Sequence, residues 1–235
     1  MSEHTYVCTV LTDRWPDGKV SDLGERYVVT LYEMIRKFAA YGADWSFTCL
    51  TDREAITGVS CLPVPKGIWT CFSKLYLFST QAFPVGARIL FFDLDTCLTG
   101  SWEPLTRVPL DKMVMLRNKV VSLTLPASGV MSWRVTPDTQ RIWSEFEPLA
   151  RKRPPYTHPC TDGWSMPKEI RTDEHWLYKY LQPDNWVGWQ DLLPNTFSSY
   201  KEEIVRYGKN TTPIVYFHGR PRPHEVKAQW NPFRP

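Results

Sequence analysis

The chain has 235 residues, 43% of them hydrophobic and 23% charged, a composition typical of a globular protein with one sizeable core. Its formal net charge of +3 excludes the strongly basic surface of a general nucleic-acid-binding protein and is compatible with an anionic small ligand. No apolar run has the length of a membrane span, and residues 1–5 lack the pattern of a signal peptide. We therefore expect a cytoplasmic protein with no membrane span.

In residues 1–100 the predicted strands and helices alternate. A β-rich run over 6–11 ends in polar residues 12–14, and apolar residues spaced three and four apart then predict a helix over 22–40, capped by Asp22 and Glu25. The next predicted elements are strands over 45–50 and 61–64, a helix over 72–78 and a strand over 89–92. This alternation predicts a mostly parallel sheet covered by helices.

The second part of the chain, residues 101–235, is richer in proline and aromatic residues. Its predicted elements are strands over 113–116, 130–133 and 214–217, helices over 138–149 and 173–181, and a proline-rich loop over 151–168. We expect these elements to extend the same sheet, so that residues 1–235 form a single domain.

The segment "ILFFDLDTCLTGS" (89–101) drives an apolar strand directly into Asp93 and Asp95. Residues two apart on a strand face the same side, roughly 7 Å apart, so both carboxylates can face one cation. Ligands of open α/β sheets gather beyond the carboxyl ends of the strands, where a hard divalent ion can also hold a phosphate. The alternative is a pair of solvated acids at the end of a strand.

Two chemistries use an apolar strand that ends in D-x-D. Haloacid dehalogenase-type phosphatases continue as D-x-D-x-T, whereas Cys97 stands at the threonine position here and no later lysine with paired aspartates follows. In sugar transfer from a nucleotide donor, the D-x-D aspartates hold a metal ion on the donor diphosphate. The segment "VYFHGRPRPHEV" (215–226) favours the second chemistry, since it offers an imidazole, a glycine and two arginines; alternatively, it is a proline-rich surface tail.

The whole chain resembles the GT-A glycosyltransferases, especially small bacterial and phage-type members similar to glycosyltransferase family 8. The resemblance is carried, in this order, by "FTCLTD" (47–52), "FSKLYLF" (72–78), "ILFFDLDTCLTGS" (89–101), "ASGVMSW" (127–133), "QDLLPNTFSSYK" (190–201) and "IVYFHGRPRPHEV" (214–226). It implies a single-domain α/β fold, Rossmann-like, with a central mostly parallel mixed sheet flanked by helices. Residues 1–100 would form the nucleotide-binding half and residues 101–235 the acceptor and sugar half.

The resemblance also implies a metal site. Asp93 and Asp95 would bind manganese or magnesium (Mn²⁺ or Mg²⁺), Asp93 also lying at the donor, and His218 would complete the coordination. Gly219 and Arg222 match the diphosphate-binding part of an "HxxGxxKP"-like segment. The spacing is compressed here and arginine replaces lysine, so either Arg220 or Arg222 is the phosphate ligand.

Further donor-binding residues follow from the same resemblance. Thr12 and Asp13 match the nucleoside-binding end of the first strand, and Lys74 matches a basic residue that reaches the donor; a solvated helix lysine is the alternative. Ser128 and Gly129 correspond to a turn that leads into a strand beside the donor sugar, although ordinary turn chemistry also explains a glycine there.

Relatives often carry a Gly-Asp-Gln triplet at a helix start, and in "RTDEHW" (171–176) Thr172, Asp173 and Glu174 take its place. Asp173 and Glu174 would then be the catalytic residues that face the transferred sugar. Because glutamate replaces glutamine, the anomeric outcome is not carried over. A helix N-cap with acids in the first turn is an alternative interpretation.

The sequence thus predicts a metal-dependent glycosyltransferase, with a hexosyltransferase favoured. Its donor would be a nucleotide diphosphate sugar, with a UDP-sugar favoured, and its acceptor a glycan, protein or small molecule that the sequence does not identify. A non-catalytic nucleotide-sugar-binding module of the same fold is the second hypothesis, and a haloacid dehalogenase-type phosphatase the third.

Overall fold

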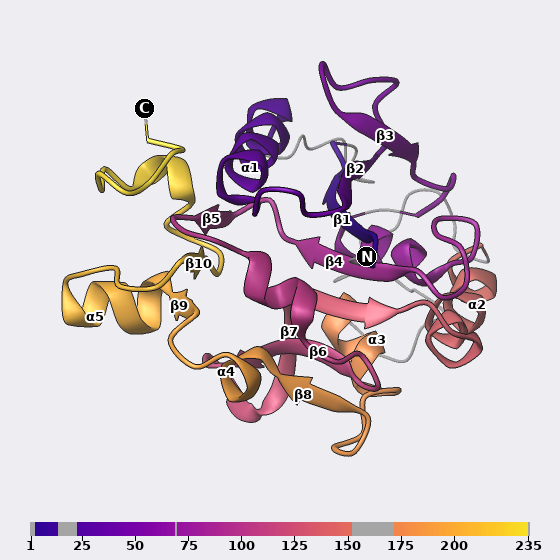
Figure 1. Cartoon of the computed structure of the whole chain (residues 1–235). Coiled ribbons are helices and arrows are strands. Elements are labelled where there is room, and N and C mark those ends of the chain that lie inside the picture. Colours follow the sequence, from indigo (N-terminus) through magenta and orange to yellow (C-terminus); the bar gives the residue numbers. More distant parts are fainter. Residues whose placement is uncertain (1–2, 14–22, 69, 152–171, 235) are drawn as a thin grey trace.

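The computed structural model describes residues 3–13, 23–68, 70–151 and 172–234 (Figure 1). Residues 152–168 of the predicted loop and the predicted capping residue Asp22 lie outside this part of the chain. No helix of the described residues is long and apolar enough to cross a membrane.

A seven-stranded sheet forms the centre of the fold, with the strand order β3-β2-β1-β4-β7-β6-β8. Its strands are β1 (Thr5–Leu11), β2 (Trp45–Thr51), β3 (Ser60–Pro63), β4 (Arg88–Phe92), β6 (Met113–Asn118), β7 (Ser122–Arg134) and β8 (Trp186–Gly188). Strand β7 pairs antiparallel with both of its neighbours, β4 and β6, and every other pairing in this sheet is parallel. This confirms the predicted mostly parallel mixed sheet, which takes strands from both parts of the chain.

A second, three-stranded sheet with the order β5-β10-β9 lies beside the first. Its strands are β5 (Thr96–Leu98), β9 (Phe197–Ser199) and β10 (Ile214–Tyr216). Strand β10 pairs antiparallel with β5, so that Tyr216 lies opposite Thr96. The C-terminal segment that follows β10 is therefore brought to the residues next to Asp95.

The helical elements are two long helices, α1 and α2, and several short ones. They are α1 (Glu25–Phe38), α2 (Pro137–Arg151), α3 (Asp173–Tyr178), α4 (Trp189–Leu192), α5 (Val205–Tyr207), the 3₁₀ helices η1 (Thr70–Phe78), η2 (Glu103–Arg107) and η4 (Pro223–Glu225), and the π-helical η3 (Tyr200–Ile204). The predicted helix over 22–40 is confirmed between Glu25 and Phe38, but its N-cap is Gly24. The helix predicted over 72–78 is a 3₁₀ helix, and the one predicted over 173–181 ends at Tyr178.

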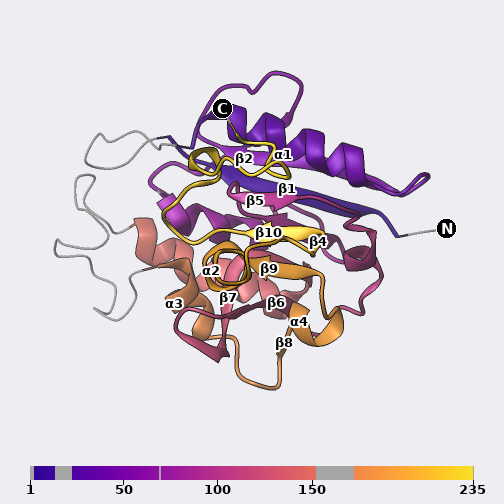
Figure 2. The same ribbon diagram turned by 90° about the vertical axis from the view of Figure 1, so that its left-hand side faces the viewer.

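The central sheet has a hydrophobic cluster on each face, and strand β4 contributes to both. Leu90 and Phe92 pack in the cluster that contains residues of α1 and the small sheet. Ile89 and Phe91 pack in the cluster that contains residues of η1, α2 and α3. Figure 2 shows α1 above the central strands and β9 and β10 beside them. The continuous apolar run of β4 is explained by burial on both faces, as expected for a covered parallel strand.

Candidate functional site

Asp93 and Asp95 lie in a turn over residues 93–96, the D-x-D turn, which connects the end of β4 at Phe92 to β5 in the second sheet. The Thr96 N–H donates to the Asp93 carbonyl at 3.0 Å and closes this turn. The expectation that both aspartates share one face of a strand is therefore wrong. Asp95 is nevertheless buried, with 8% exposed, and the Asp93 side chain is partly buried, with 31% exposed.

Asp93 is held by Lys74, which projects from η1. Lys74 Nζ lies 2.8 Å from Asp93 Oδ1, 3.2 Å from Ser128 Oγ and 3.6 Å from Asp173 Oδ2. Burial lowers the pKa of Lys74, but the carboxylates of Asp173 and Asp93 outweigh burial, and the net pKa is raised. Lys74 is therefore a buried cation that joins two carboxylates, and the interpretation as a solvated helix lysine is wrong.

Ser128 and Gly129 reach the site through an irregularity inside β7. Met115 of β6 pairs with Met131, but the next residue, Leu116, pairs with Ala127. Three β7 residues, 128–130, thus stand in a bulge that β6 does not match. Such bulges bend a strand and redirect side chains, often beside active sites. The expected turn before the strand is corrected, since β7 already begins at Ser122.

The bulge connects the D-x-D turn to helix α3. Gly129 O accepts a hydrogen bond from the Asp93 N–H at 2.8 Å. Ser128 donates through Oγ to Asp173 Oδ2 at 2.7 Å and through its N–H to Glu174 Oε1 at 3.0 Å. The sequence-predicted residues from η1, β4, β7 and α3 consequently form one hydrogen-bonded cluster.

Helix α3 supplies both of the acids that the resemblance assigned to the transferred sugar. Thr172 is the N-cap and its side chain accepts from the His175 N–H, so the capping interpretation holds for Thr172. Asp173 is only 3% exposed and lies in the cluster. Burial, followed by the charge of Asp173, raises the pKa of Glu174. The two acids thus face inward from the first turn of the helix.

Asp95 has a different partner, Arg222, whose Nη1 lies 3.0 Å from Asp95 Oδ2. The other arginine of the segment, Arg220, pairs with Glu225, and Glu225 Oε2 also accepts from the Arg222 N–H. Of the two arginines proposed for the phosphate, Arg222 is therefore the one placed at the D-x-D turn. Burial and the neighbouring Asp93 raise the pKa of Asp95 to about 7, although Arg222 opposes the shift.

His218 lies apart from the aspartates in this arrangement. Its Nε2 is 3.1 Å from Ser199 Oγ, and burial, followed by the charge of Lys201, lowers its pKa. Nowhere in the described ranges do three histidine, cysteine, aspartate or glutamate side chains come together as a metal site. The structure therefore does not assemble the predicted ligand set of Asp93, Asp95 and His218. Gly219 follows with a φ of 61°, the left-handed region that favours glycine.

Thr12 and Asp13 follow β1, which is the neighbour of β4, so they lie at the same edge of the sheet as Asp93. The Asp13 carboxylate pairs with Arg53, and Arg53 Nη1 also lies 3.2 Å from Glu25 Oε2. Arg53 was not predicted as a site residue. Its position directly after β2, a parallel neighbour of β1, is the signal that could have found it.

The charges at the D-x-D turn fit a divalent cation. Among the described residues, four carboxylates face the two cations Lys74 and Arg222. Burial, followed by the charge of Asp93, raises the pKa of Asp95, and a bound cation would offset this repulsion. The carboxylates are those of Asp93, Asp95, Asp173 and Glu174. Two carboxylates completed by water and substrate phosphates are a common way to bind magnesium. Asp93 and Asp95 can therefore hold such an ion without a third side chain.

No protein-family model and no curated protein sequence matches the chain. Among solved structures, it is similar to the bifunctional glycosyltransferase WbbM (TM-score 0.62, 12% identity, covering 99% of this chain and 49% of that one). It is also similar to the glycosyltransferase GlyE of Streptococcus pneumoniae TIGR4 (TM-score 0.58, 11% identity, 94% and 56%). A third is the galactosyltransferase LgtC in complex with donor and acceptor sugar analogs (TM-score 0.56, 12% identity, 93% and 88%).

These similarities show that the chain has the GT-A glycosyltransferase fold. The chain spans about half the length of WbbM and GlyE, at 49% and 56%. Fold does not by itself establish activity, which depends on the site.

Proposed function

We propose that the protein transfers a sugar from a nucleotide diphosphate donor to an acceptor, with a divalent metal ion at Asp93 and Asp95. The observation that carries this proposal is the buried cluster in which Lys74 joins Asp93 to Asp173 at the carboxyl edge of the central sheet. A cluster of this kind can place the metal-bound diphosphate, at Asp93, next to the transferred sugar, at Asp173. The GT-A fold and the glycosyltransferases that share it support the same function.

In this proposal each group at the D-x-D turn has a separate task. A bound Mn²⁺ or Mg²⁺ would neutralise the departing diphosphate. Arg222 would add a fixed positive charge on the Asp95 side of the turn, where its guanidinium suits phosphate oxygens. Lys74 would keep Asp93 and Asp173 at a fixed separation, and Asp173 and Glu174 would accept hydrogen bonds from sugar hydroxyls.

His218 remains a proposed third ligand. It would have to exchange its contact with Ser199 for the metal ion. Its lowered pKa keeps the imidazole neutral near pH 7, which is the form that binds metals. The left-handed Gly219 would let the backbone approach the diphosphate closely.

The nucleoside would bind beside Thr12 and Asp13, where Arg53 fixes the Asp13 carboxylate. A UDP-sugar is the favoured donor and hexosyl transfer the favoured reaction; the acceptor would be a glycan, a protein or a small molecule.

A thermal-shift screen of nucleotide sugars with and without MnCl₂ tests the donor class, because a ligand that binds only the folded protein raises its stability. We expect a UDP-sugar to raise the melting temperature more with manganese than without. If no nucleotide sugar shifts the melting temperature under either condition, the proposed function is wrong.

The role of Asp95 is tested with Asp95→Asn, which removes the charge and keeps the shape. We expect manganese-dependent donor affinity, measured by isothermal titration calorimetry, to fall at least about tenfold, because a charge-assisted contact contributes roughly 1.5–3 kcal/mol. Asp184→Asn, an exposed aspartate away from the cluster, is the matched control and should bind like the unmodified protein. Unchanged manganese-dependent affinity in Asp95→Asn would show that Asp95 is not a ligand.

A non-catalytic nucleotide-sugar-binding module is the second candidate, because Glu174 places an additional, half-buried carboxylate beside Asp173 and so changes the charge next to the transferred sugar. Donor-dependent release of nucleoside diphosphate separates the two candidates. Release with turnover supports the enzyme, whereas saturable donor binding without release supports the module.

A further inference from the structure

A cavity of about 420 Å³ lies at the other end of the central sheet from the D-x-D turn. Its lining includes Met113, where β6 begins, and Arg134, where β7 ends. Arg134 pairs with Arg88 at the start of β4, five residues before Asp93, which corresponds to roughly 16 Å along the strand. The cavity is therefore separate from the proposed donor site, and its volume lies within the range of about 300–1,000 Å³ that is usual for small-molecule sites.

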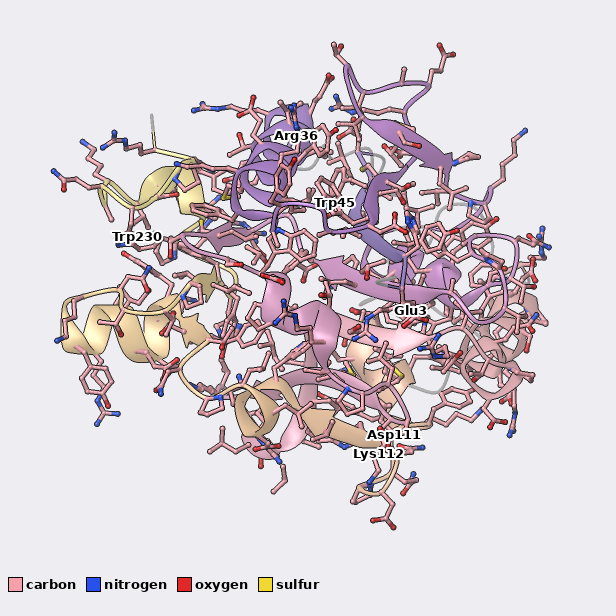
Figure 3. The ribbon with its side chains drawn as sticks, viewed as in Figure 1. Glu3, Arg36, Trp45, Asp111, Lys112 and Trp230 are labelled. Carbon is pink, nitrogen blue, oxygen red and sulfur yellow. The ribbon has the colours of Figure 1, made fainter. Side chains whose placement is uncertain are left out.

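Two labelled residues mark the position of this cavity. Asp111 and Lys112, both in its lining, lie side by side on the segment before β6 (Figure 3). In the same view they are far from Trp230 of the C-terminal segment (residues 217–234).

Hydrogen bonds and ion pairs hold the polar side chains of the cavity lining in place. Glu145 accepts hydrogen bonds from Arg141 Nη2 at 3.0 Å and from Tyr180 Oη at 2.8 Å. Thr139 Oγ1 donates to the Arg134 carbonyl at 3.1 Å, and Arg134 itself pairs with Glu3. Because these lining side chains are already fixed, a ligand would lose little affinity to ordering them.

The remaining groups of the lining favour an uncharged ligand. Glu3 pairs with Arg134 and also lies near Arg88, and Glu145 pairs with both Arg141 and Lys179. In the part of the chain that the structure describes, Asp111, Asp138 and Lys112 form neither an ion pair nor a side-chain hydrogen bond, so two carboxylates and one ammonium group are left to meet a ligand. The charges around the cavity therefore nearly balance, which gives no strong preference for an anion such as phosphate, and the two free carboxylates accept hydrogen bonds readily from hydroxyl groups.

Apolar side chains complete the lining. Met113, Ile142 and Leu181 are buried residues of the core that border the cavity, 6%, 2% and 7% exposed. A ligand for this lining must therefore present carbon-bound hydrogen on one side and several hydroxyl groups on the other. A pyranose ring has this combination.

We propose that the cavity is a binding site for a neutral carbohydrate, separate from the donor site. Asp111 and Asp138 would accept hydrogen bonds from its hydroxyl groups, and the apolar residues would contact the face of the ring. This inference goes beyond the proposed function and does not rest on it, because the site binds sugar whether or not the protein transfers one.

Isothermal titration calorimetry of the full chain with lactose, maltose, cellobiose and N,N′-diacetylchitobiose tests the proposal. We expect saturable binding of at least one disaccharide, unaffected by saturating UDP and manganese. Asp111→Ala/Asp138→Ala should weaken it at least about tenfold, since both carboxylates that would accept hydrogen bonds from the sugar hydroxyls are removed. Both residues are exposed, and Glu54→Ala is a matched exposed-acid control that should retain binding.

Hydrogen exchange locates the bound sugar. Protection of residues 110–113 and 180–185 by the disaccharide supports the proposal. The absence of saturable binding, protection only around the D-x-D turn, or equal binding by Asp111→Ala/Asp138→Ala overturns it. Failure of the UDP-sugar screen leaves this inference intact, and failure of disaccharide binding leaves the proposed function intact, so the two are tested separately.

Discussion

At the scale of single residues, Lys74 is the side chain on which the charge balance of the candidate site depends. It is 9% exposed and lies within 4 Å of carboxylate oxygens of both Asp93 and Asp173. A buried cation is costly to desolvate, but its removal leaves the neighbouring carboxylates without compensation. Lys74 should therefore matter for the stability of the free protein as well as for donor binding.

We predict that Lys74→Met lowers the free energy of unfolding by about 3–5 kcal/mol, because breaking a buried ion pair from one side leaves an unpaired charge. Urea denaturation followed by circular dichroism measures the loss. Lys74→Met/Asp93→Asn should recover part of it, since the second change removes one of the uncompensated charges. A loss below about 1 kcal/mol for Lys74→Met, the range of an exposed ion pair, would contradict this role.

At the scale of elements, the β7 bulge determines which way Ser128 points. Side chains alternate along a strand, so a shift of one residue turns each of them to the opposite face. The extra residues of the bulge give Ser128 its two hydrogen bonds to the acids of α3. The resemblance identified Ser128, but its orientation toward the acids of α3 follows from the irregular pairing of β7 with β6.

Deletion of Gly129 should therefore lower the free energy of unfolding far more than its substitution by alanine. The deletion shifts residues 122–128 by one position and lowers the free energy of unfolding by at least about 2 kcal/mol, since each hydrogen bond from Ser128 to a buried carboxylate contributes roughly 1–3 kcal/mol. In Gly129→Ala the new Cβ lies 3.5 Å from Leu116 Cδ1 and 3.8 Å from Asp93 Oδ2, both ordinary contacts. This variant should lose less than about 1 kcal/mol. Equal losses in urea denaturation would show that the bulge does not position Ser128.

The sequence predicts the elements whose hydrophobic pattern is long. Periodicity locates α1, and the apolar run before Asp93 locates β4. The three-residue strands β5, β8 and β9 were not predicted, and their pairing partners lie far away in sequence. Strand β10 is equally short, but it belongs to the apolar run predicted over 214–217. Missing β5 led directly to the error at the D-x-D segment, because the chain leaves the sheet at Phe92 to enter it.

The candidate site was also predictable only in part, its central residues better than the side chains that surround them. Lys74, Ser128 and Asp173 were identified from the resemblance and do lie together. The partners that fix the outer parts of the site, Arg53 and Ser199, were not identified. The position of Arg53 after a parallel neighbour of β1 was a usable signal, whereas the contact of Ser199 with His218 depends on pairing between short strands, which the sequence does not show. Whether His218 joins a metal ion stays a prediction.

At the scale of the whole molecule, the C-terminal segment connects the end of the chain to helix α1 and to the D-x-D turn. Phe233 is 1% exposed, and its ring stacks on Tyr27 of α1 with the centroids 4.6 Å apart. Asn231 Nδ2 donates to the Val226 carbonyl at 2.7 Å and also to the Pro223 carbonyl, which stabilises the segment that carries Arg222. Asn231 and Phe233, nine and eleven residues after Arg222, thus help to fix the segment that holds Arg222 at Asp95.

We predict that Phe233→Ala lowers the free energy of unfolding by about 3–5 kcal/mol, the usual cost of removing a buried aromatic ring. Phe233→Leu, the matched control, keeps most of the apolar volume and should lose less than about 1.5 kcal/mol. Urea denaturation measures both values. Limited proteolysis under native conditions adds a second readout, because a segment that no longer packs on Tyr27 should be cleaved faster in Phe233→Ala than in Phe233→Leu. If Phe233→Ala unfolds and is cleaved like the unmodified protein, the C-terminal segment is not held by this contact, and Arg222 must be positioned by β10 and the Asp95 pair alone.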